Sequence, residues 1–192
     1  MLLQEAINRS AITRLLEAQQ PYWQLNTGFF YAGSEAEVLI ASSTPAIFSC
    51  GLRTTEPIIR VPKTVLINLY PLPKSDQILL VANLHGINFT LGTETYDEQI
   101  KTMRLIIEQH NGPMIIAGDF NSWSDSRLEI VHAMAEMLSL ESLEYISHNR
   151  VRVFGNALDH VFCRGLKIID EETRKVTSSG HNPIIVSFRL AQ

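Results

Sequence analysis

The side chains of this sequence that could do acid–base or metal chemistry stand at the ends of short apolar runs. The run Ile78–Leu84 stops at a histidine, and the run Met114–Ala117 is followed by Gly-Asp-Phe-Asn. Polar groups at such positions lie where loops build sites above a rigid scaffold. In chain order the set is His85, Asp119, Asn121, Asp159 and His181. Imidazole and carboxylate groups together suit proton transfer or the binding of a cation.

Each member of this set also has a plain structural interpretation. A lone histidine at a strand end is more often a hydrogen-bonded rim residue, and Gly-Asp-Phe-Asn is also a good turn sequence. Asp159 and His160 are neighbours in a predicted strand, so we expect their side chains on opposite faces and only one of them in a site. Function is favoured by the order of the set, because each member ends or flanks an apolar run.

Short strands and amphipathic helices must position these residues. Apolar spacing predicts helices over 5–19, from Tyr96 to Ile107 and around 128–138. Strands are predicted over 38–41, 46–50, 65–69, 78–84, 114–117, 157–163, 166–169 and 184–188. Strands outnumber helices and often follow one another directly. That order favours packed sheets with helices outside them over a purely parallel βαβ sheet.

Length and composition agree with one folded domain. The chain has 192 residues, is 45% hydrophobic and carries a net charge of −4, which argues against coating nucleic acid by charge alone. No apolar run reaches the ~18 residues of a membrane span. The residues after Met1 do not resemble a signal peptide, and two cysteines suit a reducing compartment, so we expect a cytoplasmic protein.

Five short pieces, in this order, resemble the endonuclease/exonuclease/phosphatase superfamily of DNase I-like, metal-dependent phosphodiesterases. They are Leu-Gln-Glu at 3–5, Asn-Leu-His at 83–85, Gly-Asp-Phe-Asn at 118–121, Leu-Asp-His-Val-Phe at 158–162 and Gly-His-Asn-Pro at 180–183. The stretches 81–92 and 114–123 resemble a bacterial subgroup in particular. The resemblance implies an α/β fold, a four-layer sandwich of two mainly antiparallel sheets flanked by helices, with one domain over 1–192.

The resemblance also implies a role for each residue in the hydrolysis of a phosphoester bond by water. Glu5 and Asp119 would bind Mg²⁺, or Mn²⁺ in its place, and Asp119 would position or deprotonate the water. Asn121 would orient the phosphate. His181, with Asp159 on its other ring nitrogen, would act at the phosphoryl oxygens or as a general acid–base, and His85 would donate to the phosphate or the leaving oxygen.

Two departures from the family pattern predict a weakened site. The family begins with a strand that carries a metal-binding Asn, whereas this sequence starts almost on the next strand, so we expect the first strand to be missing. The family also has Asp where Gly180 stands. Loss of such groups typically lowers metal affinity ~10–100-fold. The alternative to a working hydrolase is therefore a catalytically impaired binding domain of the same fold, and a plain α/β domain with chance motifs is the third hypothesis.

The sequence favours a reaction class more than a substrate. DNA, RNA, a phosphoinositide and a phospholipid head group all stay open as the phosphodiester partner. The basic residues form two loose clusters, which we expect to be solvated: Arg53, Arg60 and Lys63, and Arg150, Arg152 and Arg164. Trp123 follows the Gly-Asp-Phe-Asn piece closely enough to stack on a base.

Overall fold

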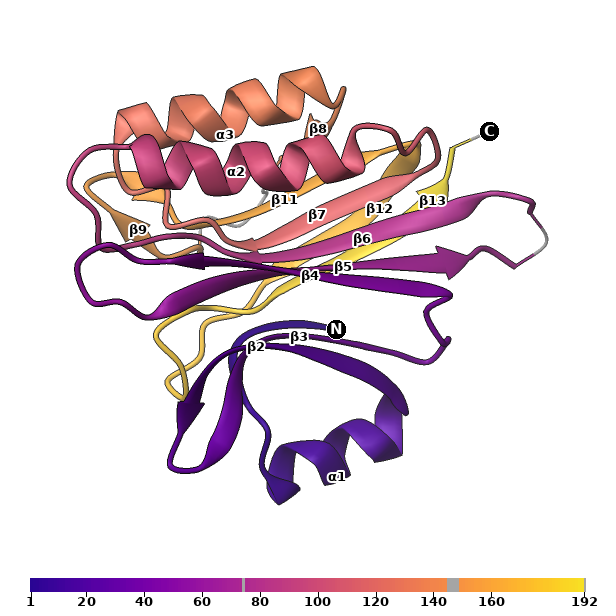
Figure 1. The fold of residues 1–192 in the computed structure, drawn as a ribbon. Coiled ribbons are helices and arrows are strands. Elements are labelled where there is room, and N and C mark those ends of the chain that lie inside the picture. Colours follow the sequence, from indigo (N-terminus) through magenta and orange to yellow (C-terminus); the bar gives the residue numbers. More distant parts are fainter. Residues whose placement is uncertain (74, 145–148, 192) are drawn as a thin grey trace.

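The computed structural model describes residues 1–73, 75–144 and 149–191, and it stacks helices and sheets in layers (Figure 1). The helices α2 (Glu94–Ile107) and α3 (Asp125–Met137) lie side by side on one outer face, and α1 (Ser10–Gln19) covers the other. The strands are β1 (Leu2–Ile7), β2 (Tyr22–Tyr31), β3 (Ser34–Ser42), β4 (Phe48–Thr55), β5 (Pro62–Pro71), β6 (Ile78–His85), β7 (Met114–Asp119), β8 (Glu141–Ser142), β9 (Arg152–Val153), β10 (Asn156–Ala157), β11 (Asp159–Arg164), β12 (Leu166–Thr173) and β13 (Ile184–Leu190).

The largest sheet has the strand order β4-β5-β6-β7-β11-β8. Its strands pair antiparallel except β6 and β7, which run parallel because α2 makes the crossover between them. The helix face of this sheet carries the main core, where Ile100 and Met103 of α2 pack on Leu84 and Ile116. Such apolar strands are buried on both faces, which is why 78–84 and 114–117 are continuous apolar runs in the sequence.

Two smaller sheets, β1-β3-β2 and β12-β13, pack on the other face of the large sheet. Val38 and Ile40 of β3 contact Leu66 and Tyr70 of β5. The pair β12-β13 covers the other half of that face, through Ile184, Val186 and Phe188 against Ala117 and Val161. The outer side of β1-β3-β2 is closed by Leu16 of α1. The second layer is thus made of two separate small sheets.

Most of the predicted elements are confirmed, but the first helix begins later than predicted. The helix expected over 5–19 starts at Ser10, because Leu2–Ile7 pairs with β3 as a strand. Sheet pairing here outweighs the helical spacing of the apolar residues. The strand β2 was not predicted. Within the described residues, no helix combines the length and the apolar character needed to cross a bilayer.

Buried amides join the two sheet layers beneath the residues of interest. The Gln4 Nε2 donates to the Asn83 Oδ1 at 2.5 Å, and the Asn83 Nδ2 donates to the carbonyls of Leu3 and Leu39, each at 2.9 Å. Asn83 is fully buried, while Gln4 is half-buried, so these bonds are largely shielded from water. They fasten β1 to β6 and thereby fix the position of Glu5 relative to His85.

Candidate active site

The register of three neighbouring strands brings three of the predicted residues side by side. Asp119 at the end of β7 is paired with His85 of β6 on one side and with Asp159 of β11 on the other. The close approach of β6 and β7 at this level depends on Gly118, which has a φ of +149° and where a Cβ would lie 2.0 Å from the Leu84 carbonyl oxygen. These three residues therefore lie together at the ends of neighbouring strands, and their role in a site stays a prediction.

Asp119 is the buried centre of the arrangement, with 7% of its surface exposed. Its Oδ1 accepts from the Asn121 backbone N–H at 2.9 Å, and its Oδ2 accepts from the Asn121 Nδ2 at 3.2 Å. Burial is the main cause that raises the pKa of Asp119, and the charge of Asp159 adds to it, while His85 and His181 act in the opposite direction. Asp119 thus takes up a proton more readily than an ordinary aspartate.

His181 comes from the loop before β13 and pairs with Asp159. Its Nδ1 lies 2.8 Å from the Asp159 Oδ2, and its Nε2 lies 3.8 Å from the Asp119 Oδ2. The hydrogen bond to Asp159 is the largest cause that raises the pKa of His181 to about 9, so the imidazolium is the prevailing form at neutral pH. The His181 side chain is 39% exposed and therefore reaches the solvent side of the site.

His85 lies on the inner side and is held by two residues that the sequence analysis did not select. Its Nδ1 is 2.7 Å from the Glu37 Oε1, and its Nε2 is 2.8 Å from the Lys63 Nζ and 3.7 Å from the Asp119 Oδ2. Which ring nitrogen donates and which accepts in these contacts depends on the tautomer of His85.

Glu37 and Lys63 left a signal in the sequence, since each interrupts or borders an apolar strand. Glu37 is fully buried and Lys63 is 7% exposed, so the expectation that Lys63 is solvated was wrong. Buried charges are almost always paired. A charged residue within a predicted buried strand therefore indicates a partner of opposite charge, although the sequence alone does not say which one.

Glu5 lies at the edge of a cleft that Asp119 also lines, and it is more exposed than the other predicted residues. It stands where the pairing of β1 with β3 shifts register, with a φ of +53°. Its side chain is 71% exposed, and its Oε1 lies 3.9 Å from the Lys63 Nζ. Glu5 and Asp119 line one cleft, which agrees with the predicted pair but leaves their shared role as a prediction.

Three residues at the centre of the site also offer possible metal ligands that lie close together. Among the described residues, Asp119, Asp159 and His181 offer oxygen and nitrogen atoms that all lie within 4.8 Å of one another. The two carboxylates fit a divalent cation, since oxygen ligands suit Mg²⁺ and Mn²⁺, whereas His181 could join them as a ligand only after losing its proton, because an imidazolium has no free lone pair. Burial is the main cause that raises the pKa of Asp119, and a bound cation would favour its carboxylate form.

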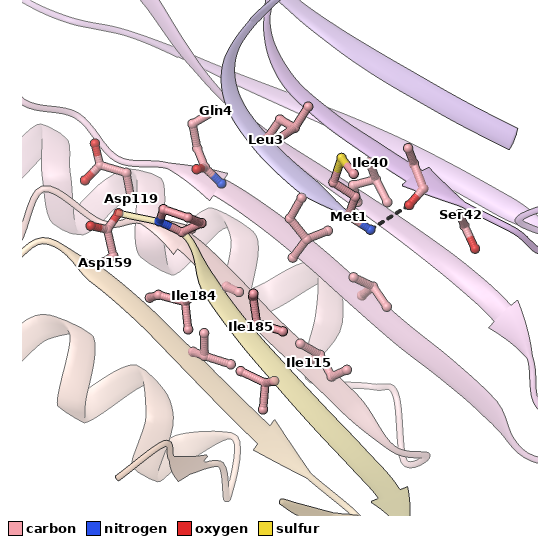
Figure 2. Close-up of a pocket in the computed structure, with 18 of the residues that line it drawn as sticks. Met1, Leu3, Gln4, Ile40, Ser42, Ile115, Asp119, Asp159, Ile184 and Ile185 are labelled. Carbon is pink, nitrogen blue, oxygen red and sulfur yellow. Dashed lines mark hydrogen bonds between the residues drawn. The ribbon is translucent and has the colours of Figure 1, made fainter. Parts of the chain in front are cut away.

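The cleft runs from these residues between β1 and β13 and has a volume of about 1090 Å³ (Figure 2). Asp119 and Asp159 lie at one end of it, while Met1, Ile115 and Ile185 line its apolar part. His160 points to the other face of β11, where its Nε2 lies 2.8 Å from the Ser122 Oγ. The two neighbouring side chains thus have different partners, as expected for opposite faces of a strand, and that only Asp159 belongs to the site stays a prediction.

Comparison with solved structures shows which fold this is. The catalytic domain of human Nocturnin with a bound sulfate anion superposes with a TM-score of 0.69 at 16% identity, over 95% of this chain and 77% of that one. An endonuclease/exonuclease/phosphatase family protein from Leptotrichia buccalis gives 0.69 at 14% identity, over 98% and 86%. D. rerio TDP2 in complex with a single-strand DNA product gives 0.68 at 17%, over 98% and 84%. The fold is the DNase I-like fold of that superfamily, mixed α/β with several sheets.

Comparison with sequences gives the family. A UPF0294 protein of Yersinia enterocolitica, YE0917, is 36% identical over 189 residues, which is 98% of this chain and 72% of that protein. A UPF0294 protein of Klebsiella pneumoniae is 40% identical over 151 residues, or 79% of this chain and 57% of that protein. No protein-family model matches the chain. The chain belongs to the UPF0294 family.

Proposed function

We propose that this chain hydrolyses a phosphodiester bond with the help of a divalent cation. One observation carries the proposal: the Nε2 atoms of His85 and His181 lie 3.7 Å and 3.8 Å from the same carboxylate oxygen of Asp119. Each histidine has its Nδ1 on a different carboxylate, Glu37 or Asp159. A carboxylate between two oriented imidazoles can take a proton from water while a neighbouring group protonates the leaving oxygen.

The proposed roles follow from the charges of the groups. Bound Mg²⁺ or Mn²⁺ would neutralise the phosphate and lower the pKa of water. Asp119, whose pKa is raised, positions the attacking water and takes its proton. His181, protonated at neutral pH, donates to a phosphoryl or leaving oxygen while Asp159 fixes its orientation. Lys63 brings positive charge to the same place, and His85, in contact with it, is proposed to donate to the phosphate or the leaving oxygen.

Two residues keep roles that rest on the resemblance. Glu5 is the proposed carboxylate ligand at the mouth of the cleft, where it is exposed enough to meet a hydrated ion. Asn121 is proposed to orient the phosphate. Its Nδ2 also donates to the Gly86 carbonyl oxygen at 3.0 Å, so the same amide holds Asp119 and the loop after His85 in place.

The substrate is proposed only as a phosphodiester. The similar structures include TDP2 with a single-strand DNA product and Nocturnin with a sulfate anion, which supports an anionic, phosphate-like ligand. The net charge of −4 favours a local phosphate site over a surface that covers a long polyanion. DNA, RNA, a phosphoinositide and a phospholipid head group remain the substrate classes to compare.

A binding domain without turnover is the second candidate. It is supported by Gly180, which provides no carboxylate beside His181, and by the Lys63 ammonium 3.9 Å from Glu5, where it competes with a metal ion for that carboxylate. This candidate predicts that phosphate binds but that no ester is cleaved.

We also propose that the two small sheets are halves of one sheet, as in a complete four-layer sandwich. The support is the apolar cleft between β1 and β13, whose facing edges carry no pairing within the described residues. One further strand, with its alternating side chains, would join them. The proposal is tested by reading the coding sequence that adjoins the segment encoding this chain. An encoded apolar strand that ends in Asn supports the proposal, and a polar, Pro-rich stretch contradicts it.

Hydrolysis of a chromogenic phosphodiester, bis(p-nitrophenyl) phosphate, tests the proposed function. The purified chain is assayed with and without Mg²⁺ or Mn²⁺, and in parallel with plasmid DNA, single-stranded DNA and RNA. Metal-dependent cleavage that Asp119→Ala reduces ~10³-fold or more supports the proposal. The control is Asp97→Ala, which removes an exposed carboxylate in the first turn of α2 and should leave the rate unchanged.

The two candidates give different outcomes. No cleavage by the wild type or by Gly180→Asp, together with phosphate binding by calorimetry, supports the binding domain. Neither cleavage nor phosphate binding contradicts both.

A further inference from the structure

Arg127 is a fully buried charge beneath the candidate site. It lies in the first turn of α3 and has no exposed surface. A guanidinium group removed from water is costly unless its N–H groups find acceptors. The acceptors that it uses therefore show what this residue holds.

The three acceptors are backbone carbonyls of two different loops. The Arg127 Nη1 donates to the Ile87 oxygen at 2.7 Å and to the Asn121 oxygen at 2.9 Å, and the Nη2 donates to the Asn88 oxygen at 2.9 Å. Ile87 and Asn88 follow His85, while Asn121 follows Asp119. The planar fork of arginine can bridge such a set of carbonyls in a way that a lysine ammonium cannot.

Two aromatic rings hold the guanidinium in its plane. Its carbon lies 4.6 Å from the centre of the Tyr96 ring and 4.4 Å from that of Trp123. The Tyr96 hydroxyl donates to the Phe120 carbonyl oxygen at 2.8 Å, and the Trp123 Nε1 donates to the Asn88 Oδ1 at 3.0 Å. Both rings thus contact the guanidinium and also bind the two loops that it joins.

The remaining polar groups of these loops are paired in the same manner. The Glu56 Oε1 accepts from the backbone N–H of Asn88 at 2.6 Å, and Glu56 is fully buried. The Gln99 side chain accepts from the Ile87 N–H at 2.8 Å and donates to the His85 carbonyl oxygen at 3.0 Å. The negative charge of Glu56 also supports the guanidinium, since it acts on the pKa of Arg127 against the lowering by burial.

We propose that Arg127 is a positioning residue that sets where His85 and Asn121 lie relative to Asp119. The inference rests on the proposed function, because it states how that same site is kept in register. Asn121 has a φ of +48°, a left-handed conformation that asparagine adopts more readily than most residues and that orders the turn after Asp119. Arg127 maintains it through the Asn121 carbonyl and ties it to the loop that begins at His85.

The test compares the same substitution at two arginines. Arg164 also donates to backbone carbonyls, those of Leu138 at 2.8 Å, Gly112 at 3.2 Å and His110, but it stands opposite Met114, at the start of β7. Asp119 is at the other end of that strand. Arg127→Lys and Arg164→Lys therefore both remove bonds from a guanidinium to backbone carbonyls, and only the first removes them at the site.

We expect Arg127→Lys to lower kcat for bis(p-nitrophenyl) phosphate ~10–100-fold with little change in KM, because small errors in the position of reacting groups are that costly. Arg127→Met should lower it further. Arg164→Lys should keep kcat within ~2-fold even though it also removes bonds to three backbone carbonyls. Equal losses of kcat in Arg127→Lys and Arg164→Lys would overturn the inference.

A second measurement separates this inference from the proposed function. Native-state hydrogen exchange follows the amides of Gly86, which donates to the Asp119 carbonyl oxygen at 2.7 Å, and of Asn121, which donates to the Asp119 side chain. Arg127→Lys should speed their exchange ~10-fold more than Arg164→Lys does. If the wild type cleaves nothing, the proposed function fails while this measurement still decides the positioning role, and equal exchange in both variants rejects it.

Discussion

Two histidine–carboxylate pairs flank Asp119, and they differ in how far they are buried. The pair His85–Glu37 lies inside the protein, with 3% and 0% of the side chains exposed, and includes the ammonium of Lys63. The pair His181–Asp159 lies at the opening of the cleft, with 39% and 11% exposed. Each histidine has its Nδ1 on the carboxylate and its Nε2 toward Asp119, so the two pairs differ in solvent contact more than in geometry.

The difference teaches that a similar hydrogen-bonding pattern can hold a histidine in different electrostatic surroundings. Carboxylates surround His181, and its hydrogen bond to Asp159 is the largest cause that raises its pKa to about 9. The Nε2 of His85 instead lies 2.8 Å from the Lys63 ammonium nitrogen. His160 shows what burial does without a carboxylate: burial is the main cause that lowers its pKa to about 4, and Arg150 adds to it.

The largest effect is expected when the buried pair is broken. Glu37→Gln removes the negative charge beside His85 and Lys63, and among the described residues it leaves the ammonium with the exposed Glu5 as its carboxylate within 4.0 Å. Removing one partner of a buried ion pair costs about 3–5 kcal/mol. We therefore expect the free energy of unfolding, measured by urea denaturation, to fall by ~4 kcal/mol.

Glu35→Gln is the matched control for that experiment. Glu35 lies two positions earlier on β3, is exposed, and accepts from Thr27 at 3.1 Å. Its replacement should change the free energy of unfolding by less than ~0.5 kcal/mol. Similar small losses of unfolding free energy in both variants would show that the buried pair does not stabilise the protein more than an exposed carboxylate does.

His160 should make the protein sensitive to acid. Its pKa in the folded state, about 4, is below the ordinary value of 6.5, so the unfolded chain binds the proton first. The stability that depends on the neutral ring is present above pH ~6.5 and is lost as the pH falls through about 4, an effect of ~3 kcal/mol. In His160→Gln this loss should disappear, as followed by urea denaturation at several pH values. An unchanged pH dependence in this variant would refute the prediction.

The pair His181–Asp159 at the opening of the cleft, called the open pair, should respond to substitution mainly through a change in the pKa of His181. In Asp159→Asn the largest cause of the raised pKa of His181 is lost, and we expect the pKa to fall from about 9 toward 6.5 in an NMR titration of the ring. Because this pKa is raised in the folded state, the pairing stabilises the protein fully below pH ~6.5 and is lost as the pH rises through about 9. The partial exposure of His181 keeps this contribution small.

Asp170→Asn, on the exposed side of β12, is the control for that titration. It should leave the pKa of His181 near 9. If the pKa of His181 also stays there in Asp159→Asn, the hydrogen bond between the two residues is not what raises it.

The sequence predicted the candidate site residues that lie at the ends of strands. His85, Asp119 and Asp159 could be predicted because β6, β7 and β11 place their ends at one level of the sheet. Glu37 and Lys63 could not, because they lie within strands of different sheets and meet only when β3 packs on β5. Arg127 was equally hidden, since its partners are backbone carbonyls and leave no trace in the residue types. Local patterns predict strands and their ends, whereas contacts between layers depend on the packing of the whole chain.

The smallest predicted effect concerns the charge beside the open pair. Gly180→Asp adds a carboxylate next to His181, at a position that is exposed and where a Cβ would meet no atom within 4 Å. We expect the affinity for Mn²⁺, measured by calorimetry, to rise ~10-fold, with the free energy of unfolding unchanged. Thr177→Asp adds the same charge to an exposed position of the same loop and is the control. An equal rise in both variants would mean that the cation responds to the total charge of the loop, whereas a rise confined to Gly180→Asp would show that the open pair, rather than the buried one, is the side on which a cation is held.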